Sequence, residues 1–199
     1  MILLTHSLLS SWLWLLKDEW SEDPMADFMT VLNREPTPAT PAMQDGIDFE
    51  DLVTDIINGE RAEDLESPWF NAAAKVARRC EGGLLQYKAS KPIKVDDVDI
   101  LLYGRLDCLN AGEIIDIKFS RRYERGKYFS STQHPVYMEL VPEAEIFTYM
   151  ISNGTDVWQE SYRRDETQSI YPVIRDFLKW LRAMGLYETY KDKWRSKEG

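Results

Sequence analysis

The chain has 199 residues, of which 44% are hydrophobic and 29% charged, and its formal net charge is −10. This length and composition fit one folded domain with a buried core and exclude a chain that is disordered throughout. Two cysteines are too few for a four-cysteine zinc or iron–sulfur site in one chain, and they fit a reducing, cytoplasmic setting.

The N-terminal stretch 2–16 is apolar, but it has neither a preceding Lys or Arg nor a following cleavage site of small residues. These features disfavour a secretion signal, and the stretch is too short to cross a bilayer, so we expect no membrane association. Apolar residues on one helical face instead predict an amphipathic helix over 7–20 that packs into the core: Leu8, Leu9, Trp12, Leu15 and Leu16.

A loop that contains Pro24 should follow, and then a linker over 35–41 in which three prolines exclude helix interior and central strand. Apolar residues at helical spacing then predict helices over 46–57 and 69–80. The pattern changes next to β-branched and apolar runs separated by glycine, proline and asparagine. These runs predict strands over 84–89, 98–109 and 113–119, the last two joined by a tight turn over 110–112.

Beyond these strands, the sequence predicts a helix over 131–140, a hairpin of strands 146–152 and 157–162, and a last helix over 168–184. The basic tail 191–199 should be exposed. This order of elements predicts an α/β fold with a mixed central sheet flanked by helices. We expect a single domain over 1–199, divided into an N-terminal helix and linker (1–45), a core (46–165) and a C-terminal helix (166–190).

The strongest chemical signal is Gly104-Arg-Leu-Asp107 followed by Glu113-Ile-Ile-Asp116-Ile-Lys118. Alternate side chains of a strand share a face, so Asp116 and Lys118 point the same way, and the turn folds Asp107 back beside them. Carboxylates gathered among apolar strands are costly unless a cation holds them. Two carboxylates and a backbone carbonyl, that of Ile117, suit Mg²⁺ or Mn²⁺. The alternative is an ordinary ion pair between Asp116 and Lys118.

These residues resemble the PD-(D/E)XK nuclease superfamily, in its RecB-like and phage-exonuclease-like branch. That branch implies an acid on a helix, then Asp, then (D/E)-x-K, and then a helix with Q-x-x-x-Y. The chain supplies all of them in this order: Glu50, Asp107, Asp116-Ile-Lys118, and Gln133-His-Pro-Val-Tyr137. Residues 5–10 also resemble the short Ser-containing helix that opens many such proteins.

The resemblance implies a restriction-endonuclease-like core and a Mg²⁺- or Mn²⁺-dependent DNA nuclease, in particular an exonuclease of recombination or repair, with a phage origin compatible. It implies metal ligands at Glu50, Asp107, Asp116 and the carbonyl of Ile117, and further catalytic roles for the remaining motif residues: Lys118, Gln133 and Tyr137. Two features depart from many members, namely the missing iron–sulfur cysteines and the lack of a His near Glu50. His6 and His134 are the only histidines, and three acids near Glu50 stay open as alternative ligands: Asp48, Asp51 and Asp55.

A basic window directly after Lys118 offsets the negative net charge, because phosphate binding depends on where cations sit. Against one acid, Glu124, it carries four cations assigned to nucleic-acid binding: Arg121, Arg122, Arg125 and Lys127. The expected partner is DNA, single- or double-stranded, with a second copy of the chain or a recombination protein as further candidates. The alternatives are a nuclease-fold module that binds nucleic acid or protein without cutting, and a hydrolase of other phosphodiesters, including RNA.

Overall fold

The computed structural model describes residues 1–17, 22–60 and 67–196. Its centre is a six-stranded sheet with the strand order β1-β3-β4-β5-β6, and β2 pairs with β3 beside this path. The strands have these bounds: β1 (Ile2–Leu4), β2 (Leu84–Val95), β3 (Val98–Asn110), β4 (Glu113–Phe119), β5 (Ile146–Ser152) and β6 (Val157–Arg163).

The sheet is mixed. Strand pairs β1–β3 and β4–β5 are parallel, whereas β2–β3, β3–β4 and β5–β6 are antiparallel. The predicted α/β fold with a mixed sheet flanked by helices is therefore confirmed. The helices have these bounds: α1 (His6–Lys17), α2 (Pro24–Leu32), α3 (Pro41–Ile57), α4 (Phe70–Cys80), α5 (Gln133–Leu140), α6 (Tyr171–Ala183) and α7 (Tyr187–Lys193), with a 3₁₀ turn at Arg164–Glu166.

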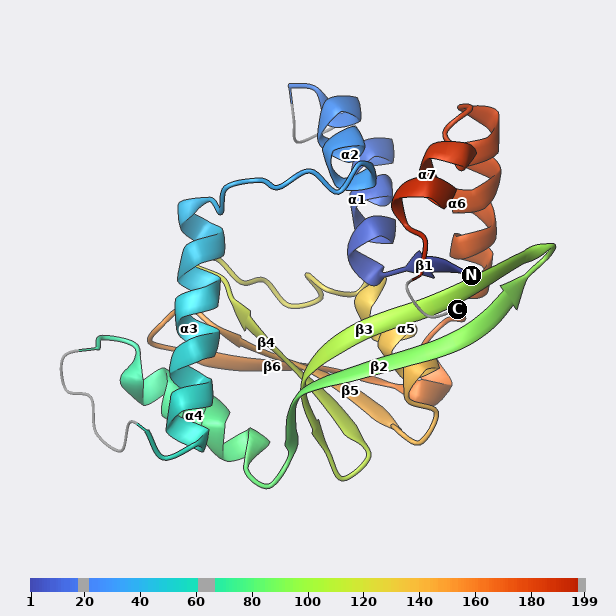
Figure 1. The fold of residues 1–199 in the computed structure, drawn as a ribbon. Helices are drawn as coiled ribbons and strands as arrows, with labels where there is room; N and C mark the ends of the chain where they lie inside the picture. The colour runs from blue at the N-terminus through green and yellow to red at the C-terminus, as the bar shows by residue number, and fades with distance from the viewer. Residues whose placement is uncertain (18–21, 61–66, 197–199) are drawn as a thin grey trace.

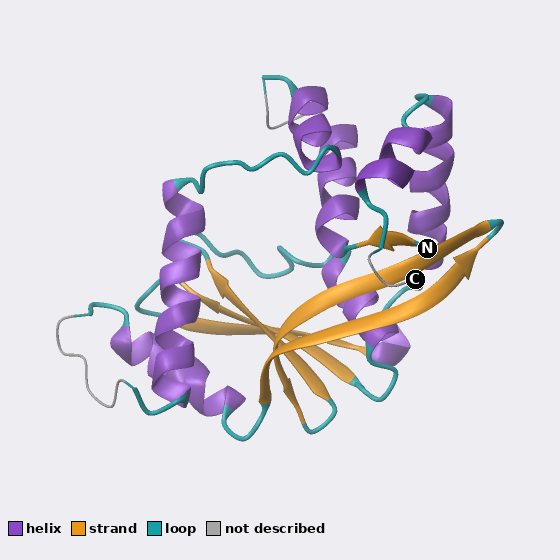
Figure 2. Cartoon of the chain, viewed as in Figure 1, coloured by secondary structure: helices purple, strands orange, loops and turns teal. Residues whose placement is uncertain are grey.

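Helices cover the sheet in two groups, because alternate residues of each strand face opposite ways (Figure 1). Ile115, Ile117 and Met150 face α3 and α4 and form a smaller core with Phe49 and Val76. The larger core gathers residues of the other helices around the opposite strand faces: Ile114, Phe147, Tyr149 and Ile151 among others. Figure 2 shows the strands splaying apart, with the long β2–β3 hairpin reaching toward α6.

Two helices begin with a capping residue followed by proline. Thr40 accepts a hydrogen bond from the backbone N–H of Met43 at 3.2 Å, and Pro41 opens α3. Asp23 accepts from Ala26 at 3.0 Å, and Pro24 opens α2. The prediction of a loop at Pro24 is wrong for this reason, and the start predicted for α3 at residue 46 is one turn or more too late.

The predicted amphipathic helix near the N-terminus is confirmed as α1, with Leu8, Leu9 and Trp12 buried. Leu16 was assigned to the same face, but it is 52% exposed. The predicted end of this helix at residue 20 lies outside the described residues. Within the described ranges, every helix is too short or too polar to cross a bilayer.

The C-terminal region differs from its prediction. The helix expected over 168–184 is α6, and a further helix, α7, follows it. Trp194 is 7% exposed, its indole N–H donates to the carbonyl of Leu32 at 2.9 Å, and its own carbonyl accepts from Leu3 at 2.6 Å. The segment 191–196 is therefore folded and anchored by Trp194, although residues 191–193 and 195 are exposed as predicted. Residues 197–199 lie outside the described residues.

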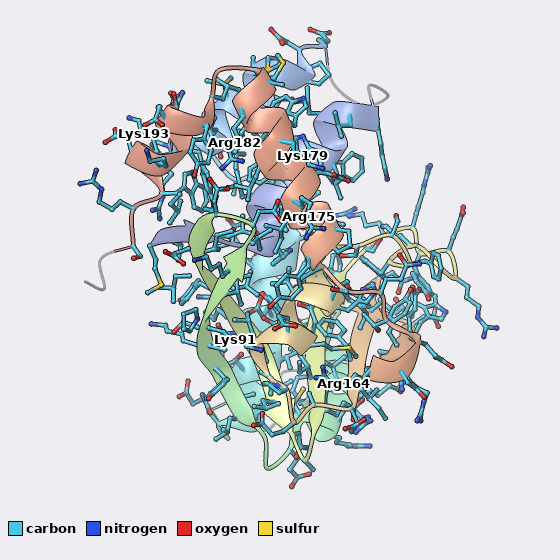
Figure 3. All side chains as sticks on the ribbon, turned by 90° about the vertical axis from the view of Figure 1, so that its right-hand side faces the viewer. Lys91, Arg164, Arg175, Lys179, Arg182 and Lys193 are labelled. Carbon is cyan, nitrogen blue, oxygen red and sulfur yellow. The ribbon has the colours of Figure 1, made fainter. Side chains whose placement is uncertain are left out.

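The β2–β3 hairpin is longer than the sequence predicted, and its far end is anchored on α6. The strand predicted over 84–89 is the first part of β2, which continues past Pro92 to Val95. Proline is tolerated at this position because β2 is an edge strand that pairs with β3 alone. At the far end of this hairpin, Asp96 and Asp97 pair with Arg175 (3.0 Å) and Arg182 (2.9 Å) on the outer side of α6 (Figure 3).

The C-terminal end of α5 is held by Arg164, which Figure 3 labels beside it. Its guanidinium donates to the carbonyl oxygens of Ala144, Met138 and Val141 at 2.7, 2.9 and 2.8 Å. These carbonyls lie in the last turn of the helix or just beyond it, where the intrahelical donors run out. Arg164 therefore anchors the helix that carries the predicted Q-x-x-x-Y motif.

Candidate active site

The candidate site lies where β3 and β4 diverge. Their antiparallel pairing covers only three residue pairs, and Cys108↔Ile115 is the pair nearest the site. Asp107 and Asp116 come next on the two strands, where the ladder has stopped. Asp107 Oδ2 accepts a hydrogen bond from the backbone N–H of Ile117 at 2.8 Å, in place of the missing ladder partner. The divergence thus opens room for two carboxylates side by side.

A cleft of about 310 Å³ opens at this point. It is lined by all six residues to which the sequence assigned catalytic roles: Glu50, Asp107, Asp116, Lys118, Gln133 and Tyr137. These residues come from four different elements, α3, β3, β4 and α5. The cleft wall also includes residues for which no role was predicted: Tyr103, Arg105 and the N-terminal Thr5, His6 and Ser7.

Asp116 is the most enclosed acid of the cleft, at 2% exposed. Its Oδ1 accepts a hydrogen bond from the side-chain amide of Gln133 at 2.5 Å. Its Oδ2 lies 2.8 Å from Lys118 Nζ, an ion-pair distance, but it is buried without a hydrogen bond of good geometry. The ion pair between Asp116 and Lys118, which the sequence offered as the alternative to a metal site, is therefore present. It is enclosed beside further acids and does not lie on the open surface.

The pKa values of two cleft residues, Asp107 and Lys118, are shifted because several acids lie close to one cation. Burial, reinforced by the negative charges of Asp116 and Glu50, raises the pKa of Asp107 well above its usual value. Burial alone would lower the pKa of Lys118, but the charges of Asp116 and Asp107 outweigh it and raise that pKa. The Lys118 ammonium is therefore a permanent cation near neutral pH, and it does not by itself neutralise the three acids.

Glu50 is the acid of α3 that faces the cleft. Its Oε1 accepts a hydrogen bond from the side-chain amide of Gln86 at 2.6 Å. The three alternative acids of the same helix do not line this cleft; they line a separate hollow beside Trp69: Asp48, Asp51 and Asp55. The geometry therefore favours Glu50 over its neighbours, as the sequence motif did.

Gln86 is a site residue that the sequence did not indicate. It stands opposite Asp107 in the β2–β3 register, between the pairs Leu85↔Cys108 and Tyr87↔Leu106, and is itself unpaired. Its φ of 51° lies in the left-handed region, which is costly for a residue with a side chain. This strained backbone bends β2 where its side chain reaches Glu50. The contact of Gln86 with Glu50 depends on backbone conformation and strand register, which the neighbouring residues in the sequence do not indicate.

Tyr137 and Gly104 fit α5 against β3. The Tyr137 hydroxyl donates to the backbone carbonyl of Arg105 at 2.9 Å. A Cβ at Gly104 would lie only 2.7 Å from Tyr137 Cε1 and 2.8 Å from Leu140 Cδ1. Glycine at this position therefore allows α5 to approach the strand closely enough for Gln133 to reach Asp116.

His6 enters the cleft from the start of α1. Its ring meets that of Tyr137 edge to face, with the centroids 5.4 Å apart. Burial, together with the positive charge of Lys118, lowers the pKa of His6 to about 3, so the imidazole is neutral. No histidine lies near Glu50 in sequence, but the fold brings His6 to the same cleft from the N-terminus. The resemblance of residues 5–10 to an opening helix was the available signal for it.

The predicted basic patch is divided in two. Arg122, Arg125 and Lys127 line one open hollow of about 370 Å³, together with Glu124. Arg121 is instead held by Asp45, whose Oδ2 accepts hydrogen bonds from its Nε at 3.1 Å and its terminal nitrogen at 2.7 Å. The three remaining cations are thus available together for phosphate groups.

The carboxylates suit a hard divalent cation chemically. Among the described residues, no three His, Cys, Asp or Glu side chains enclose an ion as they stand. Their oxygens are engaged instead by Gln86, Gln133, Lys118 and the Ile117 amide. Buried carboxylates that repel one another and share a single ammonium form a site that a cation with oxygen ligands would stabilise. The donor set therefore fits Mg²⁺ or Mn²⁺.

Comparisons with known proteins add information on the fold alone. No family model matches this sequence, and no curated protein matches it. A solved structure titled "Crystal structure of SSO0001" is similar, with a TM-score of 0.50 and 15% sequence identity. The similarity covers 92% of this chain and 76% of that chain. At this level of identity, the two proteins share an arrangement of elements, and nothing about activity follows.

Proposed function

We propose that this protein is a Mg²⁺- or Mn²⁺-dependent nuclease that hydrolyses phosphodiester bonds of DNA. One observation carries the proposal: the residues picked from the order of a sequence motif line a single cleft, although they lie up to 87 positions apart, from Glu50 to Tyr137. An accidental match to the motif would scatter such residues over the surface. Their convergence around buried, mutually repelling carboxylates supports a metal centre.

Glu50, Asp107, Asp116 and the carbonyl of Ile117 would hold the ion. A divalent ion at such a site polarises a phosphodiester group and makes water a stronger nucleophile. Gln133 fixes the orientation of Asp116 through its hydrogen bond to Oδ1, as Gln86 does for Glu50. Residues that orient metal ligands in this way commonly change metal affinity about 10- to 100-fold when they are removed.

Lys118 supplies a positive charge to the cleft beside Asp116. Its ammonium stays protonated, because Asp116 and Asp107 raise its pKa. It is therefore suited to stabilise negative charge that develops on the phosphate oxygens. Arg105, exposed on the cleft wall, is a second cation within reach of an entering phosphate.

Two finer parts of the proposal rest on the family resemblance alone, namely exonucleolytic action and a role in recombination or repair. A third part, a cytoplasmic location, rests on the low cysteine content. The hollow lined by Arg122, Arg125 and Lys127 supports a polynucleotide substrate, because its three cations outnumber the one acid.

The proposal is tested with end-labelled linear duplex DNA, single-stranded DNA, circular DNA and RNA, each incubated with Mn²⁺ or with EDTA. We expect Mn²⁺-dependent shortening of linear DNA, lost at least about 100-fold in Lys118→Ala, as for loss of a transition-state contact. The exposed Lys75 on α4 provides a matched control, and Lys75→Ala should cleave like the wild type.

A wild type that leaves every substrate intact would contradict the proposal and favour a nuclease-fold module that binds without cutting. Cleavage of RNA alone would replace DNA as the substrate. Equal activity of Lys118→Ala and wild type would show that cleavage, if seen, comes from another site or a contaminant.

A further inference from the structure

We propose that Phe129 stacks on an unpaired nucleobase of the bound DNA strand, so that single-stranded ends are preferred. The inference builds on the proposed function and names the substrate class of the same site.

Phe129 is unusually exposed. At 75%, it is more exposed than any other large hydrophobic side chain in the described ranges. The loop that bears it, residues 120–132, contains two more aromatic residues, and both are packed. Tyr123 lies against Trp158, with the ring centroids 5.4 Å apart, and Tyr128 stacks on Tyr149 at 4.4 Å and 19°. The loop thus packs two half-buried rings and leaves the third largely in solvent, tilted at 46° to the Tyr162 ring with the centroids 6.5 Å apart.

The loop is anchored rather than loose, mainly through Glu160 of β6. The carboxylate accepts hydrogen bonds from the Tyr123 hydroxyl at 2.7 Å, the Gly126 amide at 3.1 Å and the Tyr128 amide at 3.2 Å. It also accepts one from Tyr162. A ring held on such a loop loses little freedom on binding, so it is a preorganised platform.

The position of the loop ties Phe129 to the cleft. The loop begins directly after β4, which carries Lys118, and ends at Gln133, so both of its ends belong to the candidate active site. Three of its cations line the hollow described above, and they precede Phe129 by two to seven positions in sequence: Arg122, Arg125 and Lys127. A strand leaving the cleft along this loop would meet cations that bind phosphates and then a free aromatic face.

A hollow beside Phe129 has room for a base. It measures about 280 Å³, and its wall includes the rings of Tyr162 and Pro135, with Ser130, Ser131 and Gln168 among its polar residues. The first turn of α5 separates it from the cleft, since Gln133 lines one side and His134 the other. An apolar wall with polar groups at one loop suits a nucleobase, which has a flat π face and a polar edge.

The charge around the ring favours a polynucleotide over an apolar protein segment. Three cations and one acid of the same loop line the hollow described above: Arg122, Arg125 and Lys127 against Glu124. Glu166 is the one acid in the wall of the hollow beside Phe129. Alternation of cations with an exposed aromatic ring is the arrangement that binds single strands, in which bases are free to stack. Bases within a duplex already stack on each other, so the ring would act on unpaired ends.

The test is fluorescence anisotropy in EDTA, where no hydrolysis occurs. The probes are a labelled 12-nucleotide DNA strand, the same backbone with abasic sugars, a blunt duplex, and RNA of the same sequence. Wild type should bind the DNA strand at least about fivefold more tightly than the abasic one, the lower range for one base–aromatic stack. Phe129→Ala should lose this difference and keep the abasic affinity, while Phe129→Trp should retain it.

Two further variants separate stacking from charge. Met184→Ala removes another exposed apolar side chain, 48% exposed at the end of α6, and should bind like the wild type. The double variant Arg125→Ala/Lys127→Ala should weaken both strands equally. Phe129→Ala with wild-type affinity for both strands, or with an equal loss on both, would overturn the inference, as would a base-dependent loss on RNA alone.

The outcome is separable from that of the cleavage assay. A protein that prefers the base-containing strand through Phe129 but never cleaves keeps this inference and loses the nuclease. A protein that cleaves DNA while Phe129→Ala binds normally keeps the nuclease and loses this inference. A wild type that binds none of the four probes overturns the inference whatever the cleavage assay gives.

Discussion

Gly104 offers a sharp test of how α5 is seated on β3, because the substitution Gly104→Ala adds one methyl group at a close contact. The new Cβ would lie 2.7 Å from Tyr137 Cε1 and 2.8 Å from Leu140 Cδ1. Carbon atoms prefer separations of about 3.5–4.0 Å, so either these two side chains turn away or α5 moves by roughly 1 Å. The Tyr137 ring has little room to turn, because it is 4% exposed and its hydroxyl is bonded to the Arg105 carbonyl, so we expect α5 to shift.

The expected cost follows from these distances. Overpacking of this kind costs about 1–3 kcal/mol. Loss of the 2.9 Å hydrogen bond from Tyr137 to the Arg105 carbonyl adds about 1 kcal/mol. A total of about 3 kcal/mol corresponds to a fall in melting temperature of roughly 6–12 °C for a chain of this size. Movement of α5 also withdraws Gln133 from Asp116, so cleavage should fall at least about tenfold below the transition temperature.

Thermal unfolding followed by circular dichroism measures the effect, with Gly46→Ala as the matched control. A Cβ at Gly46 meets nothing within 4 Å, and this residue lies inside α3. Alanine there should raise the free energy of unfolding by about 0.5–1 kcal/mol. The reasoning is refuted if Gly104→Ala melts at or above the wild-type temperature.

Three more predictions concern metal binding, pH and salt. Gln86→Ala frees Glu50 and should raise the Mn²⁺ dissociation constant about tenfold in calorimetric titration; an unchanged constant would mean that Gln86 orients nothing. Burial would raise the pKa of Glu160, but hydrogen bonds from two tyrosines and two amides outweigh it and lower that pKa below the usual 4.5. Stability from this carboxylate is therefore present above pH 4.5 and lost as pH falls through the lowered pKa. Urea unfolding should find Glu160→Gln about 2 kcal/mol less stable than wild type at pH 7, with the difference shrinking as the pH falls below 4.5; a constant difference would contradict this. Combined Arg122→Ala, Arg125→Ala and Lys127→Ala should reduce the slope of log affinity for duplex DNA against log salt by about 2–3; an unchanged slope would show that these cations bind no phosphate.

Elements with strong periodicity could be predicted from the sequence. The strands over 113–119 and 146–152 match their predicted bounds, because each is an apolar run closed by turn residues. The face shared by Asp116 and Lys118 followed from the alternation of side chains along a strand. What the sequence could not supply was the point where β3 and β4 separate. That point depends on β3 also pairing with β1, and it creates the space for the carboxylates.

The remaining differences have two causes, overlooked helix caps and packing between distant segments. Asp23-Pro24 and Thr40-Pro41 are helix starts, and prolines weighed only as helix breakers concealed them. His6 and Gln86 reach the cleft through the tertiary fold, from elements far from the motif in sequence. Trp194 looked like part of a charged tail, but its ring is buried and its indole is bonded to Leu32. For His6, Gln86 and Trp194, long-range packing determines the position, and neighbouring residues do not encode it.

Diffraction from crystals soaked in Mn²⁺ tests most directly whether the acidic cleft is a metal centre. We expect an anomalous scattering peak between the carboxylates of Glu50, Asp107 and Asp116, which vanishes in crystals of Asp116→Asn. A cleft that stays free of Mn²⁺ at saturating concentration, or a peak that Asp116→Asn leaves unchanged, would contradict the assignment of these three acids as metal ligands.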